Sequence, residues 1–270
     1  MAGWLNVGAA LALLGLMQPC WAEQSFRLPA KKVPFGQPKV VHASPVPGER
    51  WPGTLISTAG TPAEPIQCTA TVIGPRVVLS AAHCVQNGAT MNLAVDAGPV
   101  SVTCTHHSGY APFDNYRNDI ALCLADAPIA LMVGARYERL NRDAGVLGKG
   151  DRVRLIGYGC VREGGPFANV LYTGSTLFQM RYDGRIVLAG GELAVLCEGD
   201  SGGAAYRETP PEAPVSRIVL GVNSTRGLDF KTSTITDVAA PQIAEFIVAW
   251  SSARGVEICG YDAASVLCYP

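Results

Sequence analysis

The segment from Cys197 to Gly203 places one serine, Ser201, among glycines, where it could act as a nucleophile. A serine hydroxyl is a weak nucleophile on its own, so it needs an adjacent base and hydrogen-bond donors for the oxyanion that forms on attack. The glycines would let a substrate carbonyl approach the backbone N–H groups of Gly199 and Ser201 without interference from a Cβ atom. Read alone, the segment also fits the G-x-S-x-G elbow of α/β-hydrolases or a plain glycine-rich turn.

The positions of the histidines distinguish between the known chain orders of serine, histidine and acid. All the histidines precede Ser201, and they are His42, His83, His106 and His107. An α/β-hydrolase has its histidine after its serine, so that interpretation is excluded. The subtilisin order needs an aspartate before the histidine, and because the first aspartate is Asp96, it leaves only the unpromising His106 and His107. The order histidine, aspartate, serine is met by His83, Asp119 and Ser201.

His83 and Asp119 each stand next to an apolar run that is expected to be a strand. His83 follows the run 77–79 and is beside Cys84, which can hold it in place through a disulfide. Asp119 precedes the run 120–124, but Asn118-Asp119 fits a turn that starts a strand equally well. The local context therefore leaves the role of Asp119 open.

The composition is typical of a globular protein made of short strands. The 270 residues, 48% hydrophobic and 16% charged, suffice for one large domain or two small ones. The 30 glycines and 19 prolines, with many Val and Thr, favour strands joined by turns and indicate the all-β class. Because 21 basic and 22 acidic residues leave a net charge of −1 with no long run of either sign, no nucleic-acid partner is expected.

Runs of apolar or Thr-rich sequence between turn residues predict strands in two halves. The first half, 40–145, has runs at 54–58, 68–73, 77–79, 91–95, 100–105 and 120–124. The second half, 146–254, has runs at 152–158, 170–179, 186–188 and 218–222, with an exposed Pro-rich loop at 208–214. Residues 241–252 are predicted to form a packing helix, because Pro241 suits a first turn, apolar residues recur at helical spacing and Gly255 follows.

Residues 1–22 are similar to a secretory signal peptide. An apolar core at 7–17 is followed by Pro19 and by the small residue Ala22, which suits cleavage. A membrane anchor is the alternative, but the apolar run is short for spanning a bilayer and ends at a proline. Residues 23–39 are rich in Pro and Lys and indicate a flexible leader, a possible propeptide. We therefore expect a secreted or periplasmic protein that has no membrane contact once the signal is removed.

Removal of the signal also removes Cys20 and leaves an even number of cysteines, which indicates disulfides in an exported protein. They are Cys68, Cys84, Cys104, Cys123, Cys160, Cys197, Cys259 and Cys268. Eight cysteines can form disulfides in roughly a hundred different combinations, and their spacing in the sequence does not choose among these combinations. The alternative is a zinc site at Cys104, His106 and His107, but adjacent histidines on an extended strand point to opposite faces. We expect no metal and no cofactor.

Three motifs follow one another along the chain. They are Thr71-Val72-Ile73 through Ser80-Ala81-Ala82-His83-Cys84, then Asn118-Asp119-Ile120-Ala121-Leu122, then Gly199-Asp200-Ser201-Gly202-Gly203. In this order they resemble the motifs of the trypsin/chymotrypsin-like serine protease family. The similarity extends from about Val40 to Trp250, and the tail, residues 255–270, lies outside the usual pattern. The resemblance implies two six-stranded antiparallel β-barrels with a C-terminal helix and an active site between the barrels.

The resemblance also implies a function, that of a secreted serine endopeptidase working through an acyl-enzyme. Ser201 would be the nucleophile, His83 the general base and then the general acid, and Asp119 the group that orients His83. The N–H groups of Gly199 and Ser201 would form the oxyanion hole, and the substrate would be a protein or peptide. The alternative is a catalytically inactive, protease-like binding protein.

Two further features follow from the resemblance. Cys68 with Cys84 matches the family bridge that braces the histidine loop, and we expect the other pairs to be Cys104 with Cys123, Cys160 with Cys197, and Cys259 with Cys268. Family members commonly become active when a leader is cut and the new N-terminal ammonium pairs with the aspartate before the nucleophile, here Asp200. The best candidate cut is between Lys39 and Val40, although His42-Ala43 stands where relatives have Gly-Gly.

In this family the residue six positions before the nucleophile forms the floor of the specificity pocket. Here it is Val195, with Leu196 beside it, and a buried apolar floor cannot pair with a substrate cation. Cleavage after Lys or Arg is therefore not expected. The wall would be Ser224, Thr225 and Arg226, with Arg226 replacing a glycine at the pocket mouth. We expect small or medium apolar residues to be preferred, and acidic residues second.

Overall fold

The structure is a computed structural model that describes residue 1 and residues 43–160, 165–167, 169–208, 217–227, 229, 231–261 and 266–270. The predicted signal peptide (apart from Met1), the leader at 23–39, Val40 and nearly all of the loop at 208–214 lie outside the described residues. The described residues resume at Ala43, which is buried.

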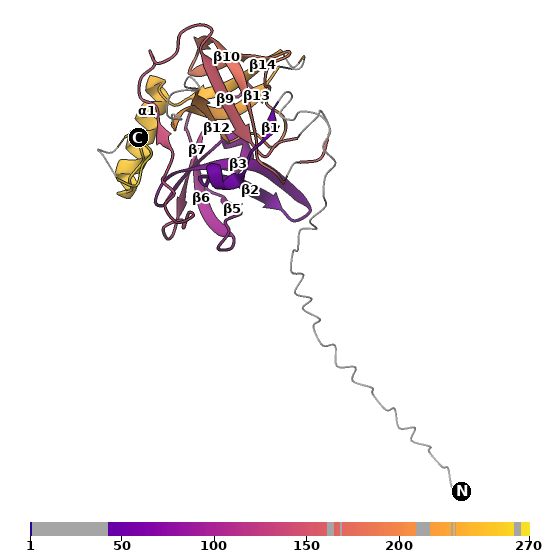
Figure 1. Ribbon diagram of the computed structural model, residues 1–270. Helices are drawn as coiled ribbons and strands as arrows, with labels where there is room; N and C mark the ends of the chain where they lie inside the picture. Colours follow the sequence, from indigo (N-terminus) through magenta and orange to yellow (C-terminus); the bar gives the residue numbers. More distant parts are fainter. Residues whose placement is uncertain are drawn as a thin grey trace. The chain divides into compact units, whose positions relative to one another are not determined.

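The first six strands of the core close into an antiparallel barrel in the order β2-β3-β4-β7-β6-β5 (indigo to magenta in Figure 1). They are β2 (Thr54–Thr61), β3 (Glu64–Gly74), β4 (Val77–Ser80), β5 (Thr90–Leu93), β6 (Val100–His106) and β7 (Ala121–Ala125). Alternation along β6 shows why the barrel forms: Val102 and Cys104 are buried, whereas Ser101 and Thr103 face outward. Strands β3 and β4 form an antiparallel hairpin across Gly74-Pro75.

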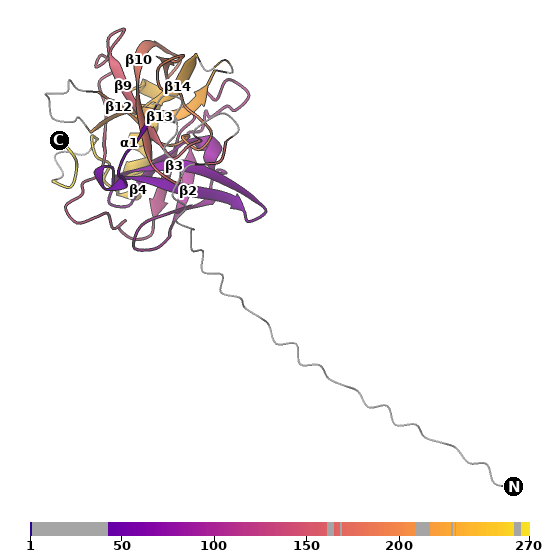
Figure 2. The same ribbon diagram turned by 45° about the vertical axis from the view of Figure 1, so that its right-hand side comes forward.

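The second barrel has the strand order β9-β10-β11-β14-β13-β12, and β12 pairs with β9 to close it. Its strands are β9 (Arg152–Gly157), β10 (Tyr172–Tyr182), β11 (Arg185–Ala189), β12 (Ala204–Arg207), β13 (Ile218–Arg226) and β14 (Thr232–Asp237). Two short strands add to its outside, β1 (Ser44–Pro45) on β10 and β8 (Arg139–Leu140) parallel to β13. Figure 2 shows the two sets of strands from another side. The predicted all-β fold of two six-stranded antiparallel barrels is confirmed.

One α-helix, α1 (Pro241–Arg254), follows the second barrel and confirms the predicted helix, which is two residues longer than expected. Pro241 occupies its first turn, and Gly255 ends it in the left-handed conformation. Ile243, Ile247 and Trp250 are buried in a core cluster that contains residues of both barrels. The helix therefore has the packing role that was predicted. Among the described residues there are also two short 3₁₀ helices, η1 (Gly48–Arg50) and η2 (Ala82–Cys84).

Strands β12 and β14 were not predicted from the sequence. The sequence of β14, Thr-Ser-Thr-Ile-Thr-Asp, has one strongly apolar residue, so it gives no alternation signal. Its buried polar residues are satisfied by long-range hydrogen bonds: Ser233 accepts one from the Leu196 N–H, and Thr236 donates one to the Asp119 carbonyl. These polar residues serve the site rather than the core.

The tail after α1 is closed by the Cys259–Cys268 disulfide. The Cys259 N–H donates to Ile73 O of β3 at 2.8 Å, and the Leu140 N–H of β8 donates to Cys259 O at 2.8 Å. Because β3 belongs to the first barrel and β8 pairs with the second, the tail is bonded to both.

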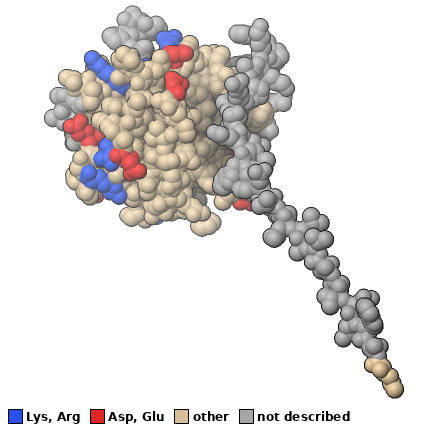
Figure 3. All heavy atoms as spheres, turned by 90° about the horizontal axis from the view of Figure 1, so that it is seen from below, with Lys and Arg blue, Asp and Glu red and all other residues tan. Residues whose placement is uncertain are grey.

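Acidic and basic side chains are interspersed on the face drawn in Figure 3, and uncharged surface surrounds them. This distribution agrees with the near-zero net charge. Among the residues described, no helix is long and apolar enough to cross a membrane.

Candidate active site

His83 lies on η2, directly after β4, and its side chain faces Asp119. Its Nδ1 atom is 2.7 Å from Asp119 Oδ2, and its backbone N–H donates to Asp119 Oδ1 at 3.0 Å. Asp119 is completely buried, whereas the His83 side chain is 23% exposed. An ionised carboxylate only accepts hydrogen bonds, so the ring proton of neutral His83 is on Nδ1 and Nε2 is left as a free base.

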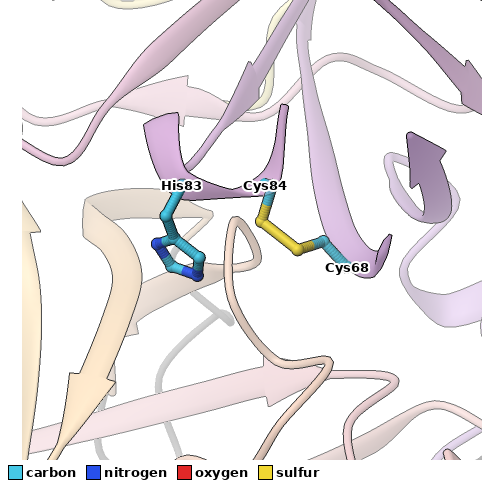
Figure 4. A group of neighbouring side chains, drawn as sticks. All are labelled: Cys68, His83 and Cys84. Atoms are coloured by element: carbon cyan, nitrogen blue, oxygen red, sulfur yellow. A yellow bond between two sulfur atoms is a disulfide. The ribbon is translucent and has the colours of Figure 1, made fainter. Parts of the chain in front are cut away.

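A disulfide braces the short helix that carries His83. Cys68 at the inner part of β3 is bonded to Cys84, and the bond lies beside the imidazole in Figure 4. The other pairs are those expected from the resemblance and sequence: Cys104–Cys123, Cys160–Cys197 and Cys259–Cys268. Cys160–Cys197 ties the loop after Gly159 to the segment that contains Ser201.

Asp119 accepts a second hydrogen bond through the same oxygen. Ser224 Oγ donates to Asp119 Oδ2 at 2.6 Å. Ser224 is the extra residue of a β-bulge, because Asn223 pairs with Ile235 and Thr225 with Thr234 on β14. Bulges re-aim a side chain, and here the hydroxyl reaches the buried carboxylate. Ser224 is one of the residues that the sequence placed in the specificity pocket, and its hydroxyl contacts the proposed triad.

Ser201 lies in the turn between β11 and β12, and it is half-buried. Its Oγ is 3.5 Å from Ser224 O, and among the residues described no hydrogen bond joins it to His83. Gly199 and Gly202 on either side have φ angles of 93° and 80°, which favour glycine. A Cβ atom on Gly202 would also collide with Thr69 O of the first barrel. The turn therefore needs glycine both for its conformation and for its closeness to β3.

Asp200 is buried beneath the same turn. Its two carboxylate oxygens accept from the N–H groups of Gly159 and Cys197, each at 2.9 Å. Burial raises the pKa of Asp200 to about 7 against the opposing effect of these two hydrogen bonds. In the part of the chain that the structure describes, no cationic side chain pairs with it. Ala43 lies against Gly174 of β10, whose other close neighbour is Ala194.

The expected pocket residues come from two segments that meet at β14. Val195 and Leu196 are buried, and the Leu196 N–H donates to Ser233 Oγ at 3.0 Å. Ser233 is the register partner of Arg226 on β13. Arg226 Nη2 is 3.1 Å from Glu198 Oε1, and Glu198 stands three residues before the serine. The structure thus brings together the apolar segment and a charged pair next to Ser201.

Residues 40–244 match the sequence profile of the Trypsin family. The chain belongs to the trypsin family. Serine protease SP24D of Anopheles gambiae is 29% identical to this trypsin-family protein over 223 residues, which are 73% of this chain and 80% of the relative. Human heparin binding protein shares the fold with a TM-score of 0.61 at 18% identity, over 77% of this chain and 94% of its own. A structure of GrC has a TM-score of 0.63 at 19% identity, over 79% and 98%.

Asn223 is a further residue of this trypsin-family protein that the sequence did not single out. It is fully buried, and its side-chain amide donates to Ile156 O at 3.0 Å and to Asp200 O at 3.2 Å. Its backbone exchanges hydrogen bonds with Gly202 and Gly203 at 2.9 and 2.8 Å. Asn223 therefore fixes the serine turn from β13. Asn223 directly follows the predicted strand 218–222, and that position did not indicate a partner.

The cysteine-containing clusters of this trypsin-family protein are not thiolate sites. The described groups that come near one another are Cys68, His83 and Cys84, and Cys160, Cys197 and Glu198, and their cysteines are in disulfides. Cys104, which the zinc alternative needed, is bonded to Cys123. His106 and His107 have different partners, Val85 O at 2.7 Å and Gln242 O at 3.3 Å.

Proposed function

We propose that this trypsin-family protein is a secreted serine endopeptidase that hydrolyses peptide bonds through His83, Asp119 and Ser201. The observation that carries the proposal is the 2.7 Å contact between His83 Nδ1 and buried Asp119 Oδ2, together with the 3.5 Å contact of Ser201 Oγ with Ser224 O. Ser224 thus touches both the acid and the serine. Because Nδ1 is held by Asp119, Nε2 is the ring atom that we assign as the base toward Ser201.

In the first half of the reaction, Ser201 Oγ attacks the carbonyl carbon of the scissile bond. His83 Nε2 takes the hydroxyl proton, and Asp119 stabilises the imidazolium that forms. The carbon–nitrogen bond then breaks, and the same proton passes from Nε2 to the leaving amine. Ser201 is left as an ester of the substrate acid.

Water completes the cycle. His83 Nε2 removes a proton from water as it attacks the ester carbonyl, and then returns that proton to Ser201 Oγ when the ester bond breaks. In both halves a negative charge forms on the carbonyl oxygen. The N–H groups of Gly199 and Ser201 are the proposed donors to it, and one such donor contributes roughly a hundredfold to a thousandfold in rate.

We infer that removal of the leader activates the protein. Asp200 is buried without a cationic side chain among the described residues, and a new ammonium at Val40 would be a suitable partner for it. Ala43, three residues later, is already buried on the second barrel. Export through residues 1–22 agrees with the four disulfides, which persist in oxidising compartments.

The substrate proposed is a protein or peptide with a small or medium apolar residue before the scissile bond, and an acidic residue as second choice. Val195 is buried and apolar, so a substrate cation above it would lose its hydration without gaining a partner. Arg226 at the mouth supplies the positive charge that an acidic side chain would need.

The test is hydrolysis of a peptide library by the chain cleaved after Lys39. Wild type and Ser101→Ala, which changes an exposed serine on β6, should cut the same peptides at the same rate. Ser201→Ala should lose turnover by about 10⁴-fold or more, because the triad acts as a unit. Equal turnover by wild type and Ser201→Ala would contradict the proposal.

A further inference from the structure

Thr69 on β3 contacts the serine turn through its backbone and its side chain. It follows Cys68, whose disulfide braces the helix of His83, and it is fully buried. Its N–H donates to Ser201 O at 2.9 Å, and its carbonyl lies so close to Gly202 that a Cβ atom there would collide with it. One strand of the first barrel therefore braces the base at residue 68 and the nucleophile turn at residue 69.

The side-chain hydroxyl of Thr69 bridges two segments of the second barrel. Its Oγ1 donates to Gly199 O at 2.7 Å and accepts from the Tyr158 N–H at 3.0 Å. Both polar roles of the hydroxyl are thus used in a buried setting, where a lost partner leaves an unsatisfied group. Tyr158 precedes Gly159, whose N–H donates to Asp200. The hydroxyl is therefore a junction between the loop after β9 and the serine turn.

We propose that Thr69 is a positioning residue for the oxyanion hole. The inference rests on the proposed function, because it assigns work to the Gly199 N–H group that the reaction uses. Gly199 has a φ of 93° and no Cβ atom to restrict its rotation. The peptide planes beside it therefore depend on contacts with other residues for their orientation. The hydroxyl bond fixes the Gly199 carbonyl, and the Thr69 N–H fixes the Ser201 carbonyl. Each of these carbonyls lies in the peptide plane that directly follows an oxyanion donor, so Thr69 holds the backbone on the C-terminal side of both donor N–H groups without touching the substrate.

If Thr69 has this role, its loss should weaken stabilisation of the transition state and leave substrate binding largely unchanged. A donor that is misdirected by a fraction of an ångström binds the developing oxyanion poorly, whereas contacts to the rest of the substrate remain. Thr69→Val keeps the shape of the side chain and removes the hydroxyl. Thr69→Ser keeps the hydroxyl and removes the methyl group.

Thr71 provides a matched control on the same strand. It is as fully buried as Thr69, but its hydroxyl has no hydrogen-bond partner among the described residues. Thr71→Val therefore makes the same chemical change in β3 without removing a hydrogen bond to the turn.

The experiment measures kcat and KM on the best library peptide, and the inhibition constant of the matching peptide aldehyde, which forms a tetrahedral adduct with the serine. Thr69→Val should lower kcat about 10- to 100-fold, weaken the aldehyde by a similar factor and leave KM within about threefold. Thr69→Ser and Thr71→Val should stay within about threefold of wild type in all three constants. If Thr69→Val does not fold, Thr69→Ala compared with Thr69→Ser isolates the hydroxyl in the same way.

Two results would overturn the inference while the proposed function stands. One is a Thr69→Val enzyme whose kcat and aldehyde inhibition equal those of wild type. The other is an equal loss in Thr69→Val and Thr69→Ser, which would assign the effect to methyl packing. A wild type that neither cleaves the peptide nor binds the aldehyde would overturn the proposed function, and this inference with it.

Discussion

Ser224 Oγ and His83 Nδ1 meet on one atom, Asp119 Oδ2, at 2.6 and 2.7 Å. The carboxylate is fully buried, so these two donors replace hydrogen bonds to water that the carboxylate lost on burial. The bulge in β13 that turns Ser224 toward Asp119 also leaves Ser224 O next to Ser201 Oγ. A single irregular residue of the second barrel is therefore in contact with the acid from the first barrel and with the serine.

Ser224→Ala should lower kcat/KM about 10- to 100-fold, because a hydrogen bond to a charged group contributes about 1.5–3 kcal/mol. Steady-state kinetics on the library peptide checks this value. Ser251→Ala is the control: this serine is also buried, but among the described residues its hydroxyl bonds only to Val248 O within α1. A Ser224→Ala enzyme as active as the control would show that Asp119 does not need the second donor.

The pKa of Asp200 predicts how cleavage of the leader changes stability. Burial raises this pKa from 3.8 to about 7, so the stability that the neutral group contributes is complete below about pH 3.8 and is lost as the pH rises through 7. An ammonium at Val40 would pair with the ionised group and remove that loss. At pH 8 the form beginning at Val40 should therefore be more stable than the uncleaved chain by on the order of 3 kcal/mol.

Urea unfolding of both forms from pH 4 to 8 measures this difference. Asp200→Asn keeps the shape of the side chain without the charge, and it should make the two forms equally dependent on pH. A chain beginning at Glu23 that is as active and as stable at pH 8 as the form beginning at Val40 would contradict the activation proposal.

Glu138 predicts a second pH dependence that is independent of the site. It is fully buried, and its Oε1 is 2.8 Å from Arg217 Nη1, while the Arg217 guanidinium stacks on Trp51 and Tyr269 at 3.9 and 4.6 Å from the ring centroids. Burial raises the pKa of Glu138 from 4.5 to about 7, and the charge of Arg217 opposes part of this rise. The stability due to the neutral carboxyl is complete below about pH 4.5 and is lost as the pH rises through 7.

Glu138→Gln should therefore gain stability relative to wild type between pH 4 and 8. The gain should approach about 3 kcal/mol, since one pKa unit corresponds to about 1.4 kcal/mol. Urea unfolding across this range gives the difference. Parallel curves for the two proteins would mean that Glu138 is ionised throughout and that the ion pair outweighs burial.

The pair of Arg226 and Glu198 predicts the order of substrate preference. Glu198 is 57% exposed, and partly exposed ion pairs contribute little, so a substrate carboxylate can replace Glu198 at small cost. Arg226→Ala should reduce cleavage after acidic residues about tenfold and leave cleavage after small apolar residues within about threefold. Library profiling checks both values, and dominant cleavage after Arg by wild type would refute the assigned pocket.

The sequence could indicate the fold and the proposed triad because the strands give short apolar signals and the triad gives a chain order. His83 and Asp119 stand next to apolar strand runs, and the order of His83, Asp119 and Ser201 discriminates between triad types. The strands of the first barrel were predicted to within a few residues, since they alternate or form apolar runs. The longest disagreement there is β3, which begins at Glu64 instead of Cys68 because its outer part is a polar hairpin arm.

The support of the site was not predictable, because it depends on pairs far apart in the sequence. Ser224 reaches Asp119 across 105 residues, and Thr69 reaches Gly199 across 130. Each is an ordinary small polar residue within a strand, and only the register of the barrels and the bulge in β13 decide where its hydroxyl points. Strand β14 was missed for the same reason. Its polar residues Ser233 and Thr236 are buried, and their hydrogen bonds are to residues far away in the sequence.

The central claim is that Ser201 is an activated nucleophile, and labelling with a fluorophosphonate tests it most directly. Intact mass and peptide mapping should show one adduct, on Ser201, in wild type and in Ser101→Ala when both are cleaved after Lys39, and the full chain should take up the label more slowly. Ser201→Ala should take up no label. Absence of label from both forms of wild type, or an undiminished adduct in Ser201→Ala, would contradict the claim and favour a protease-like binding protein.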